Sequence, residues 1–323
     1  MRENTNRLSG TLQKLGISLS KKKFRMRKEH LQLISMTLPG VILLILFNYM
    51  PMFGTILAFK KFKYNLGFLK SPWCGLDNFK FFFQSGNLSR LLKNTVGMNL
   101  LFLIVGTILN VILALLLYEI TSRLAIKVFQ TIMFLPFLIS WITASFALYT
   151  NLSDVDGIIN NFIIANGGEK IMWYGEAGRW PLILLICYIW KTTGFGVIVN
   201  YGNLVSIDKS YFEAAELDGA SRLQSMWYIS IPFIRPIVTM MFILSLGRVF
   251  SADFGMFYYL PRNSSLLYRT TDVIDTYVYR ALRVSGDVGM SSAIGLCQSV
   301  IGFVILLLTN KVSRVLNEDG GII

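Results

Sequence analysis

Charge is the first property that this sequence has little of. Asp, Glu, Lys and Arg together account for 15% of its 323 residues, whereas a soluble domain usually carries about 25%. Hydrophobic residues account for 54% of the chain. This composition does not match an ordinary soluble domain, and it indicates a membrane protein.

The sequence also has few of the residues that build metal and catalytic sites. It contains three cysteines, Cys74, Cys187 and Cys297, and one histidine, His30. No cluster of Cys and His has the spacing of a zinc site, so we predict no metal. A Ser-His-Asp triad would have to use His30, which lies in a basic, solvated segment, and this argues against hydrolase chemistry.

No nucleotide-binding loop of the form G-x-x-x-x-G-K-[ST] occurs in the chain. Nothing in the sequence can therefore cradle the phosphates of a nucleotide. We predict no cofactor on this chain, and any dependence on ATP and Mg²⁺ would have to come from a partner.

The net charge of +13 raises the possibility of nucleic-acid binding. The Lys and Arg residues cluster beside apolar segments, however, as in KKKFRMRK at 21–28. Flanking cations of this kind bias the direction in which a helix inserts into a membrane. We therefore predict contact with membrane lipid and no nucleic-acid partner.

Six apolar segments reach the length of about 20 residues that a bilayer requires. The first follows about thirty polar, basic residues and is longer than the apolar core of a cleaved signal, so we expect it to remain in the mature protein. The predicted spans cover residues 33–58, 96–118, 128–149, 181–204, 232–251 and 292–310.

The spans predict an all-α integral membrane protein with one six-span domain, residues 31–316. A basic tail, residues 1–30, precedes this domain, and a short tail, residues 317–323, follows it. Six of the ten residues at 21–30 are basic, which favours a cytoplasmic N-terminus, although the lysines of loop 59–95 weaken that count. Six spans then place the C-terminus in the cytoplasm as well.

The fourth span carries a charge near the bilayer midplane. A lysine there, Lys191, costs on the order of 3 kcal/mol, so we interpret it as facing a cavity, with snorkelling to an interface as the alternative. TTGFG follows at 192–196. These residues either weaken the helix beside a pathway or allow helices to pack closely, and both interpretations stay open.

Other residues in the spans have a functional and a structural interpretation. Trp141, Tyr149, Trp190 and Tyr201 could stack on a C–H-rich ligand, but Trp and Tyr also gather at membrane interfaces. Arg248 precedes Asp253 by five residues, so an ion pair or an interfacial position is favoured for it. The candidate ligand path comprises Lys191, Trp190, Asn200, Trp141, Tyr149 and Arg248.

Small residues on the sixth span have a simpler interpretation. Gly295, Ser299 and Gly302 are spaced four and three residues apart and fall on one face of a helix. We predict that this face is a helix-packing surface.

One connector between spans contains a charged, helix-forming stretch, YFEAAELDGASRLQSMWYISIPFIRP at 211–236. Glu213 and Glu216 lie three residues apart on one side of a short predicted helix. Gly219 suits the position after a helix end, and Pro232 leads into the fifth span. Such defined turn chemistry indicates a rigid element that is presented to a cytosolic partner.

This stretch resembles the signature of the permease subunits of bacterial ABC importers: Glu-Ala-Ala, three residues, Gly, nine residues, Ile-x-Leu-Pro. Here the signature comprises Glu213-Ala214-Ala215, Gly219, Ile229 and Ile231-Pro232, with Ile231 in place of leucine. The segments SPWCGLDNF, FLPFLISW, IWKTTGFG and DVIDTYVYR are similar to the carbohydrate-uptake branch, specifically its polysaccharide-type, LplB-like permeases. The resemblance extends from about residue 30 to the C-terminus.

The resemblance implies the type I importer permease fold, with a coupling helix within residues 209–227. It also implies four kinds of partner: a second homologous permease, two cytosolic ATPase subunits that bind ATP and Mg²⁺, an extracellular solute-binding protein and an oligosaccharide. Glu213 would be the acidic contact with the ATPase, Ala214 and Ala215 a close-packing surface, and Gly219 the turn. The chain itself would be a transport subunit of the bacterial cell membrane and not an enzyme.

Three other classes of protein are alternatives to this interpretation. A secondary transporter needs carboxylates inside the membrane, but Glu119 and Asp253 lie only at span edges. A membrane-embedded transferase needs a convergent acid/base or metal site, which the sequence does not show. An ABC permease for peptides or amino acids is compatible with the signature alone, and only the wider resemblance favours a sugar.

Overall fold

The computed structural model describes residues 28–84 and 86–316 of the chain. Within these residues the secondary structure is helical, apart from an isolated β-bridge between Lys60 and Trp73. The predicted all-α fold class is confirmed. Most of the predicted N-terminal tail, residues 1–27, and the predicted C-terminal tail, residues 317–323, lie outside the described residues.

The chain divides into two compact units, residues 1–54 and 55–323, whereas the sequence predicted one domain over 31–316. The first unit is a helical rod whose consecutive turns contact one another, which accounts for its separation. From Lys28 onward it consists of the following elements: α2 (Lys28–Leu44), the π-helix η1 (Ile45–Tyr49) and α3 (Met50–Met52). The 3₁₀ helix η2 (Phe53–Phe59) crosses the boundary.

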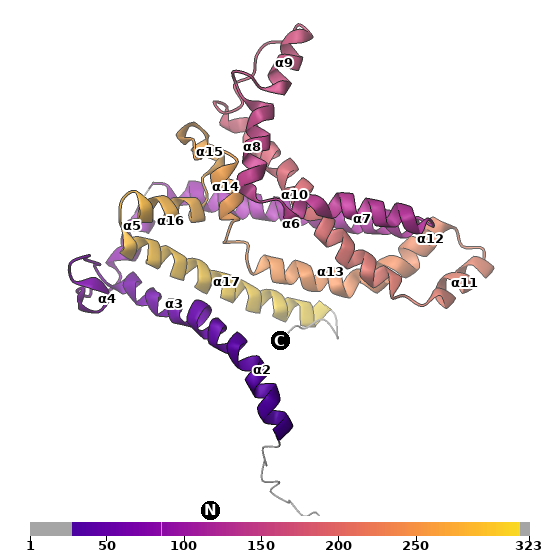
Figure 1. Cartoon of the computed structure of the whole chain (residues 1–323), viewed down its shortest axis with the longest axis horizontal. Helices are drawn as coiled ribbons and strands as arrows, with labels where there is room; N and C mark the ends of the chain where they lie inside the picture. The colour runs from indigo at the N-terminus through magenta and orange to yellow at the C-terminus, as the bar shows by residue number, and fades with distance from the viewer. Residues whose placement is uncertain (1–27, 85, 317–323) are drawn as a thin grey trace, which may run out of the picture. The chain divides into compact units, whose positions relative to one another are not determined.

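The second unit contains the remaining helices (Figure 1). Their bounds are α4 (Gly67–Lys70), α5 (Asp77–Gln84), α6 (Leu88–Tyr118), α7 (Arg123–Leu138), α8 (Trp141–Leu152), α9 (Ile158–Ala165), η3 (Ala177–Arg179), α10 (Trp180–Val205), α11 (Lys209–Leu217), α12 (Arg222–Ser225), η4 (Met226–Ser230), α13 (Ile231–Leu246), α14 (Phe254–Tyr259), η5 (Ser265–Leu267), α15 (Tyr268–Thr271), α16 (Ile274–Arg283) and α17 (Val288–Leu316).

Five helical stretches of the described chain are long and apolar enough to cross a membrane, and a bent pair provides a sixth candidate. The five stretches are Gln32–Phe59, Leu88–Tyr118, Ala177–Val205, Arg222–Leu246 and Val288–Lys311. The predicted fifth span, 232–251, therefore ends too late, because the helix stops at Leu246 and Arg248 lies beyond it.

The third predicted span, 128–149, is not one straight helix. It consists of α7 and α8, which meet at an angle of 98°. Ile139 and Ser140 are both extended between them, and the Ser140 hydroxyl accepts a hydrogen bond from the backbone N–H of Thr143 at 3.1 Å. Ser140 thus caps the start of a new helix, and this cap is the reason for the break.

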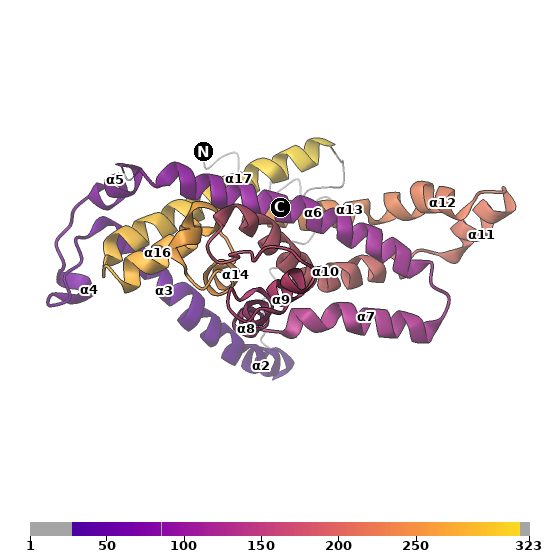
Figure 2. The ribbon, with the colours of Figure 1, turned by 90° about the horizontal axis from the view of Figure 1, so that it is seen from above.

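The glycines of TTGFG do not interrupt α10, which is continuous from Trp180 to Val205. A side chain at Gly194 would collide with the backbone oxygen of Met133 on α7, and one at Gly196 with the Asn110 side chain on α6. Figures 1 and 2 show α6 and α7 alongside α10. Of the two open interpretations, close helix packing is therefore confirmed.

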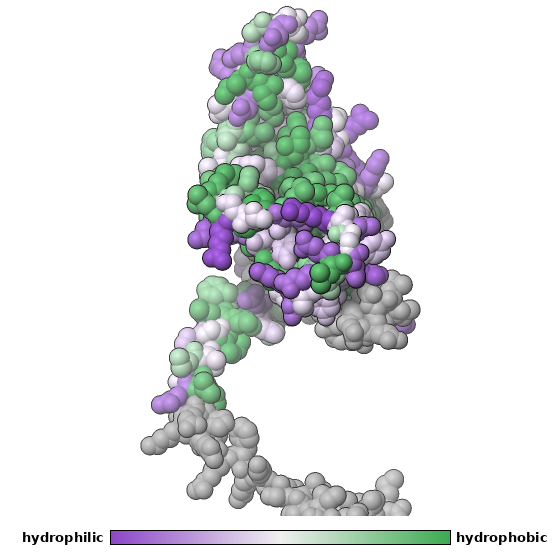
Figure 3. All heavy atoms as spheres, turned by 90° about the vertical axis from the view of Figure 1, so that its right-hand side faces the viewer, coloured by the Kyte–Doolittle hydropathy of each residue, from purple (hydrophilic) through white to green (hydrophobic). Residues whose placement is uncertain are grey.

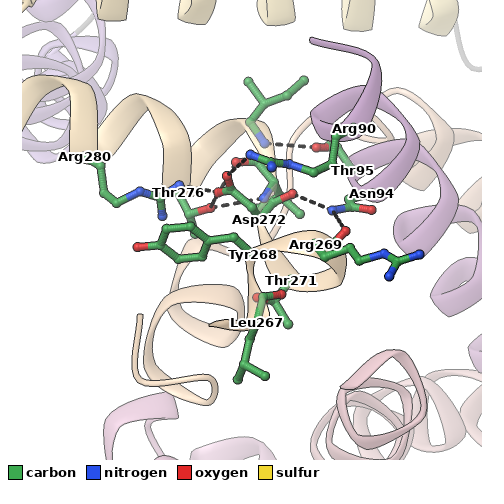
Figure 4. A network of polar contacts seen from close by, with 12 residues as sticks. Arg90, Asn94, Thr95, Leu267, Tyr268, Arg269, Thr271, Asp272, Thr276 and Arg280 are labelled. Carbon is green, nitrogen blue, oxygen red and sulfur yellow. Dashed lines mark hydrogen bonds and ion pairs between the residues drawn. The ribbon is translucent and has the colours of Figure 1, made fainter. Parts of the chain in front are cut away.

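A buried carboxylate, Asp272, ties the start of α6 to the α15–α16 region (Figure 4). The Asp272 side chain is 1% exposed and forms ion pairs with Arg280 and, at 3.3 Å, with Arg90 of α6. The Thr276 hydroxyl also donates to it, and Asn94 of α6 donates to its backbone oxygen at 2.9 Å. A buried carboxylate needs such partners to offset the loss of water, so this network fixes where α16 packs.

The α11–α12 hairpin lies at one end of the long helices of the second unit (Figures 1 and 2). The helices α5 and α16 lie at the opposite end, beside the start of α17. In Figures 1 and 2, α6 runs between these two ends, whereas α10 and α13 extend from the hairpin end and α17 extends from the other end.

Candidate functional site

The stretch predicted to couple to a partner forms a capped helical hairpin. The Asp208 carboxylate accepts the backbone N–H of Ser210 at 3.0 Å and caps the start of α11. This hydrogen bond lowers the pKa of Asp208, because it stabilises the charged form. Asp208 thus remains an ionised cap at neutral pH.

Gly219 ends α11 as the sequence predicted. Its φ of +80° lies in the left-handed region, which glycine enters without a Cβ clash. The N–H of Gly219 donates to the oxygen of Glu216 at 3.0 Å, and the N–H of Ala220 donates to that of Ala215 at 2.9 Å. This is the Schellman arrangement, and it fixes the direction in which the chain leaves α11.

The second arm of the hairpin starts with a capping box. The Ser221 hydroxyl accepts the N–H of Gln224, and the Gln224 side chain accepts the N–H of Ser221 at 2.7 Å. From Arg222 the helix continues through the π-helical turn η4 into α13, as one stretch that ends at Leu246. Ile229 and Pro232 of the signature lie inside this stretch, so the hairpin and the fifth span share one helix.

Aromatic contacts join α11 to the long helices. Phe212 packs against Tyr118 at the end of α6, with ring centroids 5.8 Å apart, and Tyr118 also contacts Tyr201 of α10. Tyr211 packs against Phe233 of α13 at 5.5 Å. The helix α11 therefore packs directly on α6 and α13, and Tyr118 extends the cluster to α10.

The outer surface of the hairpin combines acidic and apolar side chains. Glu213, Ala214 and Glu216 are exposed, whereas Ala215 is half-buried. Figure 3 views the molecule from this end and shows hydrophilic residues interspersed with apolar ones. The large exposed apolar side chains at this end are those of Tyr211 and Leu217 on α11, Leu223 on α12, and Trp227 and Tyr228 on η4.

A groove with a volume of about 580 Å³ lies between α13 and α17. Polar groups line it on both sides, including Ser245, Arg248, Gln298 and Ser299. The remaining lining residues are Met241, Leu244, Gly247, Phe250, Ser251, Gly295, Gly302, Phe303 and Leu306.

Glycines on both helices shape this groove. A Cβ at Gly302 would lie 2.7 Å from the oxygen of Gly247, so the two helices touch there. At Gly295 a Cβ would meet nothing within 4 Å. The predicted packing surface of α17 is thus correct at Gly302, whereas Gly295 and Ser299 line open space.

A smaller cavity of about 90 Å³ lies among α6, α10 and α13. Asn110 and Asn200 line it, and among the described residues their Oδ1 atoms have no hydrogen-bond partner. A volume of this size suits about three water molecules, which could satisfy both oxygens. Met241 and Ser245 line this cavity and the groove, so the two are neighbours.

Lys191 lies at the α7–α8 corner. Its ammonium donates to the backbone oxygens of Phe137, at 3.0 Å, and of Ile139, and it lies 5.2 Å from the centre of the Trp141 ring. The Trp141 indole donates to Asp253 at 2.6 Å. Lys191 and Trp141 are therefore neighbours, and the lysine caps the carbonyls that end α7.

Two other predicted path residues, Tyr149 and Trp190, line neither the groove nor the small cavity. Arg262 stacks on the Tyr149 ring, with its guanidinium carbon 4.0 Å from the ring centre. Trp190 is 45% exposed on α10. The structure does not bring the six predicted residues together: Arg248 lines the groove, Asn200 the small cavity, and the other four lie elsewhere.

The predicted ion pair between Arg248 and Asp253 does not form. Asp253 instead accepts the Trp141 indole N–H and caps α14 through the N–H of Met256. Among the described residues no carboxylate lies within ion-pair distance of Arg248. The sequence did not predict that Ser245 and Gln298 line a groove. The only indication was that both are polar residues within apolar spans.

We expect Lys191→Met to act mainly on stability, because the ammonium satisfies carbonyls at a helix end. Hydrogen bonds from charged groups contribute about 1.5–3 kcal/mol, so thermal unfolding of the purified protein in detergent should begin several degrees lower. Lys191→Arg, which keeps the charge and the donors, should lose less. Loss of transport by Lys191→Met at unchanged stability would instead support a role in a ligand path.

Comparison with known proteins identifies similar chains. Residues 106–317 match the family described as binding-protein-dependent transport system inner membrane component. Protein LplB of Bacillus subtilis (strain 168) is 34% identical over 287 residues, which cover 88% of this chain and 88% of that protein. The polygalacturonan/rhamnogalacturonan transport system permease protein YteP of the same strain is 32% identical over 285 residues, again 88% of each.

A solved structure shows the same fold. It is described as a bacterial alginate ABC transporter in complex with an alginate pentasaccharide-bound periplasmic protein. One of its chains matches with a TM-score of 0.81 and 31% sequence identity, and the match covers 91% of this chain and 97% of that one.

Proposed function

Since the chain belongs to the family of binding-protein-dependent transport system inner membrane components, we propose that it forms the translocation path of an ATP-driven oligosaccharide importer. In this proposal it works with a second homologous permease, two cytosolic ATPase subunits and an extracellular solute-binding protein. The chain is a multi-pass membrane protein, and we place both of its termini and the α11–α12 hairpin in the cytoplasm.

The single observation that carries the proposal is the polar groove between α13 and α17. A membrane-embedded surface that only contacts lipid has no use for Ser, Gln and Arg side chains, because each costs free energy in hydrocarbon. A groove of about 580 Å³ that is lined by these polar groups and by glycines can hold part of a polar solute. The relatives for sugar-polymer transport, YteP and the alginate transporter, support an oligosaccharide as that solute.

Transport by alternating access follows from the link between the groove and the hairpin. In this mechanism, ATP binding closes the ATPase dimer and moves the docked α11–α12 hairpin as a rigid body. The movement changes which side of the membrane the path faces, and the equilibrium shifts only because ATP and solute bind the two states differently. Glu213, Ala214 and Ala215 form the docking face, and Gly219 sets its angle.

We expect Gly295→Leu to lower solute uptake by the reconstituted transporter at least tenfold. A Cβ at Gly295 meets nothing within 4 Å, so the leucine can enter the groove without disturbing helix packing, and there it would obstruct the path. Uptake of radiolabelled oligosaccharide into proteoliposomes, normalised to the amount of assembled complex, measures the effect.

Gly97→Leu is a matched control, because Gly97 is exposed on α6, meets nothing within 4 Å and does not line the groove. It should transport at the unsubstituted rate. Normal uptake by Gly295→Leu would show that solute does not pass through this groove.

A further inference from the structure

The groove between α13 and α17 carries an unbalanced charge. Among the described residues that line it, Arg248 is the one charged residue, and none is acidic. Arg248 is exposed just beyond the end of α13, and no described carboxylate pairs with it. A guanidinium that faces a solute path without an ion-pair partner is available to an anionic solute.

Asp253 follows the lining residue Ser251 by two positions, and Asp275 bonds to the lining residues Ser251 and Gln298. Both carboxylates also bond to groups outside the groove. Asp253 caps α14 and accepts the Trp141 indole. Asp275 accepts the backbone N–H of Ala252 at 2.8 Å, and Gln298 and Ser251 donate to it more weakly. Burial raises the pKa of Asp275, and these hydrogen bonds oppose that rise. Neither carboxylate lies within ion-pair distance of Arg248.

The hydroxyl groups of the groove are arranged as acceptors. Ser245 donates its hydroxyl proton to the oxygen of Met241 and Ser299 donates to that of Gly295, both at 2.9 Å. The lone pairs of these hydroxyl oxygens therefore remain for a ligand that donates. Sugar hydroxyls are such donors, whereas Arg248 can only donate and requires an acceptor.

From this arrangement we infer that the groove selects an acidic oligosaccharide, one that carries uronate carboxylates. Arg248 then binds a carboxylate, and the hydroxyl oxygens of Ser245 and Ser299 accept hydrogen bonds from hydroxyl groups of the sugar rings. This inference rests on the proposed function and names its substrate class. The planar guanidinium fork matches a carboxylate in two parallel hydrogen bonds. The single charge of a carboxylate also balances the single guanidinium, whereas a phosphate monoester carries about two charges.

The test uses the complete transporter with its own partner subunits and binding protein in proteoliposomes. The probes are short galacturonate and alginate oligosaccharides, their carboxyl methyl esters and neutral glucans of equal length. We expect the free acids to be taken up at least tenfold faster than the esters. Arg248→Gln should remove most of this preference, and Arg248→Lys should restore part of it, since lysine keeps the charge but loses the fork.

Each other outcome has a defined meaning. Uptake of neutral glucans or esters at the rate of the acids overturns the inference but leaves the proposed function standing. Uptake of no saccharide at all overturns the proposed function itself. Loss of the second permease from the purified Arg248→Gln complex would show that Arg248 pairs across the subunit interface, which also overturns the inference.

Discussion

Replacing Glu213 with lysine is expected to reduce uptake at least a hundredfold, to the background of empty proteoliposomes. Glu213 is exposed on α11, and among the described residues no ion pair or side-chain hydrogen bond involves its carboxylate. The substitution should therefore leave the fold intact and reverse the charge only at the docking face. A buried interfacial charge that loses its partner typically costs 2–5 kcal/mol of binding free energy, roughly.

Copurification measures this prediction directly. The ATPase subunits should elute with the unsubstituted permease and should be lost from Glu213→Lys. Glu169→Lys makes the same charge change at an exposed position in the loop between α9 and α10, and it should retain the ATPase. Equal retention by both variants would refute the docking role of α11.

The variant Gly219→Val tests the role of the hairpin independently of the charge on Glu213. At a φ of +80°, a β-branched residue is strained by roughly 1–2 kcal/mol, so the hairpin should change its angle while the acidic face remains. We expect transport to fall further than ATPase binding does, because the partner still docks but transmits its movement poorly.

Asp272→Asn is expected to have the largest effect on stability. The substitution removes one partner of a buried ion-pair network and leaves Arg280, which is 17% exposed, without its counter-charge. Breaking a buried pair in this way costs about 3–5 kcal/mol. The purified variant should unfold at a markedly lower temperature in detergent, and its α15–α16 region should be cleaved sooner by protease.

A surface ion pair provides the matched control. Asp77 and Lys80 lie 3.0 Å apart, and both side chains are about two-thirds exposed. Exposed pairs contribute about 0–1 kcal/mol, so Asp77→Asn should leave the unfolding temperature almost unchanged. If Asp272→Asn were as mild as this control, the Asp272 network would not hold α16 in place.

Much of the fold follows from hydropathy, because burial in lipid imposes a length on each apolar segment. The resemblance to ABC importer permeases is likewise confirmed by the family match. Helix ends were harder to predict. The helix α6 begins at Leu88, eight residues before the predicted span, and its added turns carry polar residues such as Asn94, which bonds to the Asp272 region.

The α7–α8 corner shows a second limit of hydropathy. The residues on both sides of Ser140 are apolar, so the average hydropathy hides a turn of 98°. Only local features of the sequence indicated the break between the two helices: Pro136 near the end of α7, and Ser140, which caps α8. Lys191 was predicted to face a cavity, but its carbonyl partners come from residues 52–55 positions away in the chain, which no local pattern reveals.

One part of the candidate site could be predicted from the sequence and the other part could not. The hairpin was predictable because its cap, turn glycine and acidic face are short-range features with fixed spacing. The groove was not, because Gly295 and Gly302 have the same spacing whether they line open space or a helix contact. Only the facing residues of α13 distinguish the two cases.

The unbroken helix from Arg222 to Leu246 gives the molecule a mechanical property. Its 25 residues form a rod about 37 Å long, at 1.5 Å per residue. A tilt of about 10° at the hairpin would displace the far end by about 6 Å, which is comparable to the width of a sugar ring. In the proposed mechanism, a small swing at the hairpin would therefore become a movement large enough to open or close the groove around Ser245.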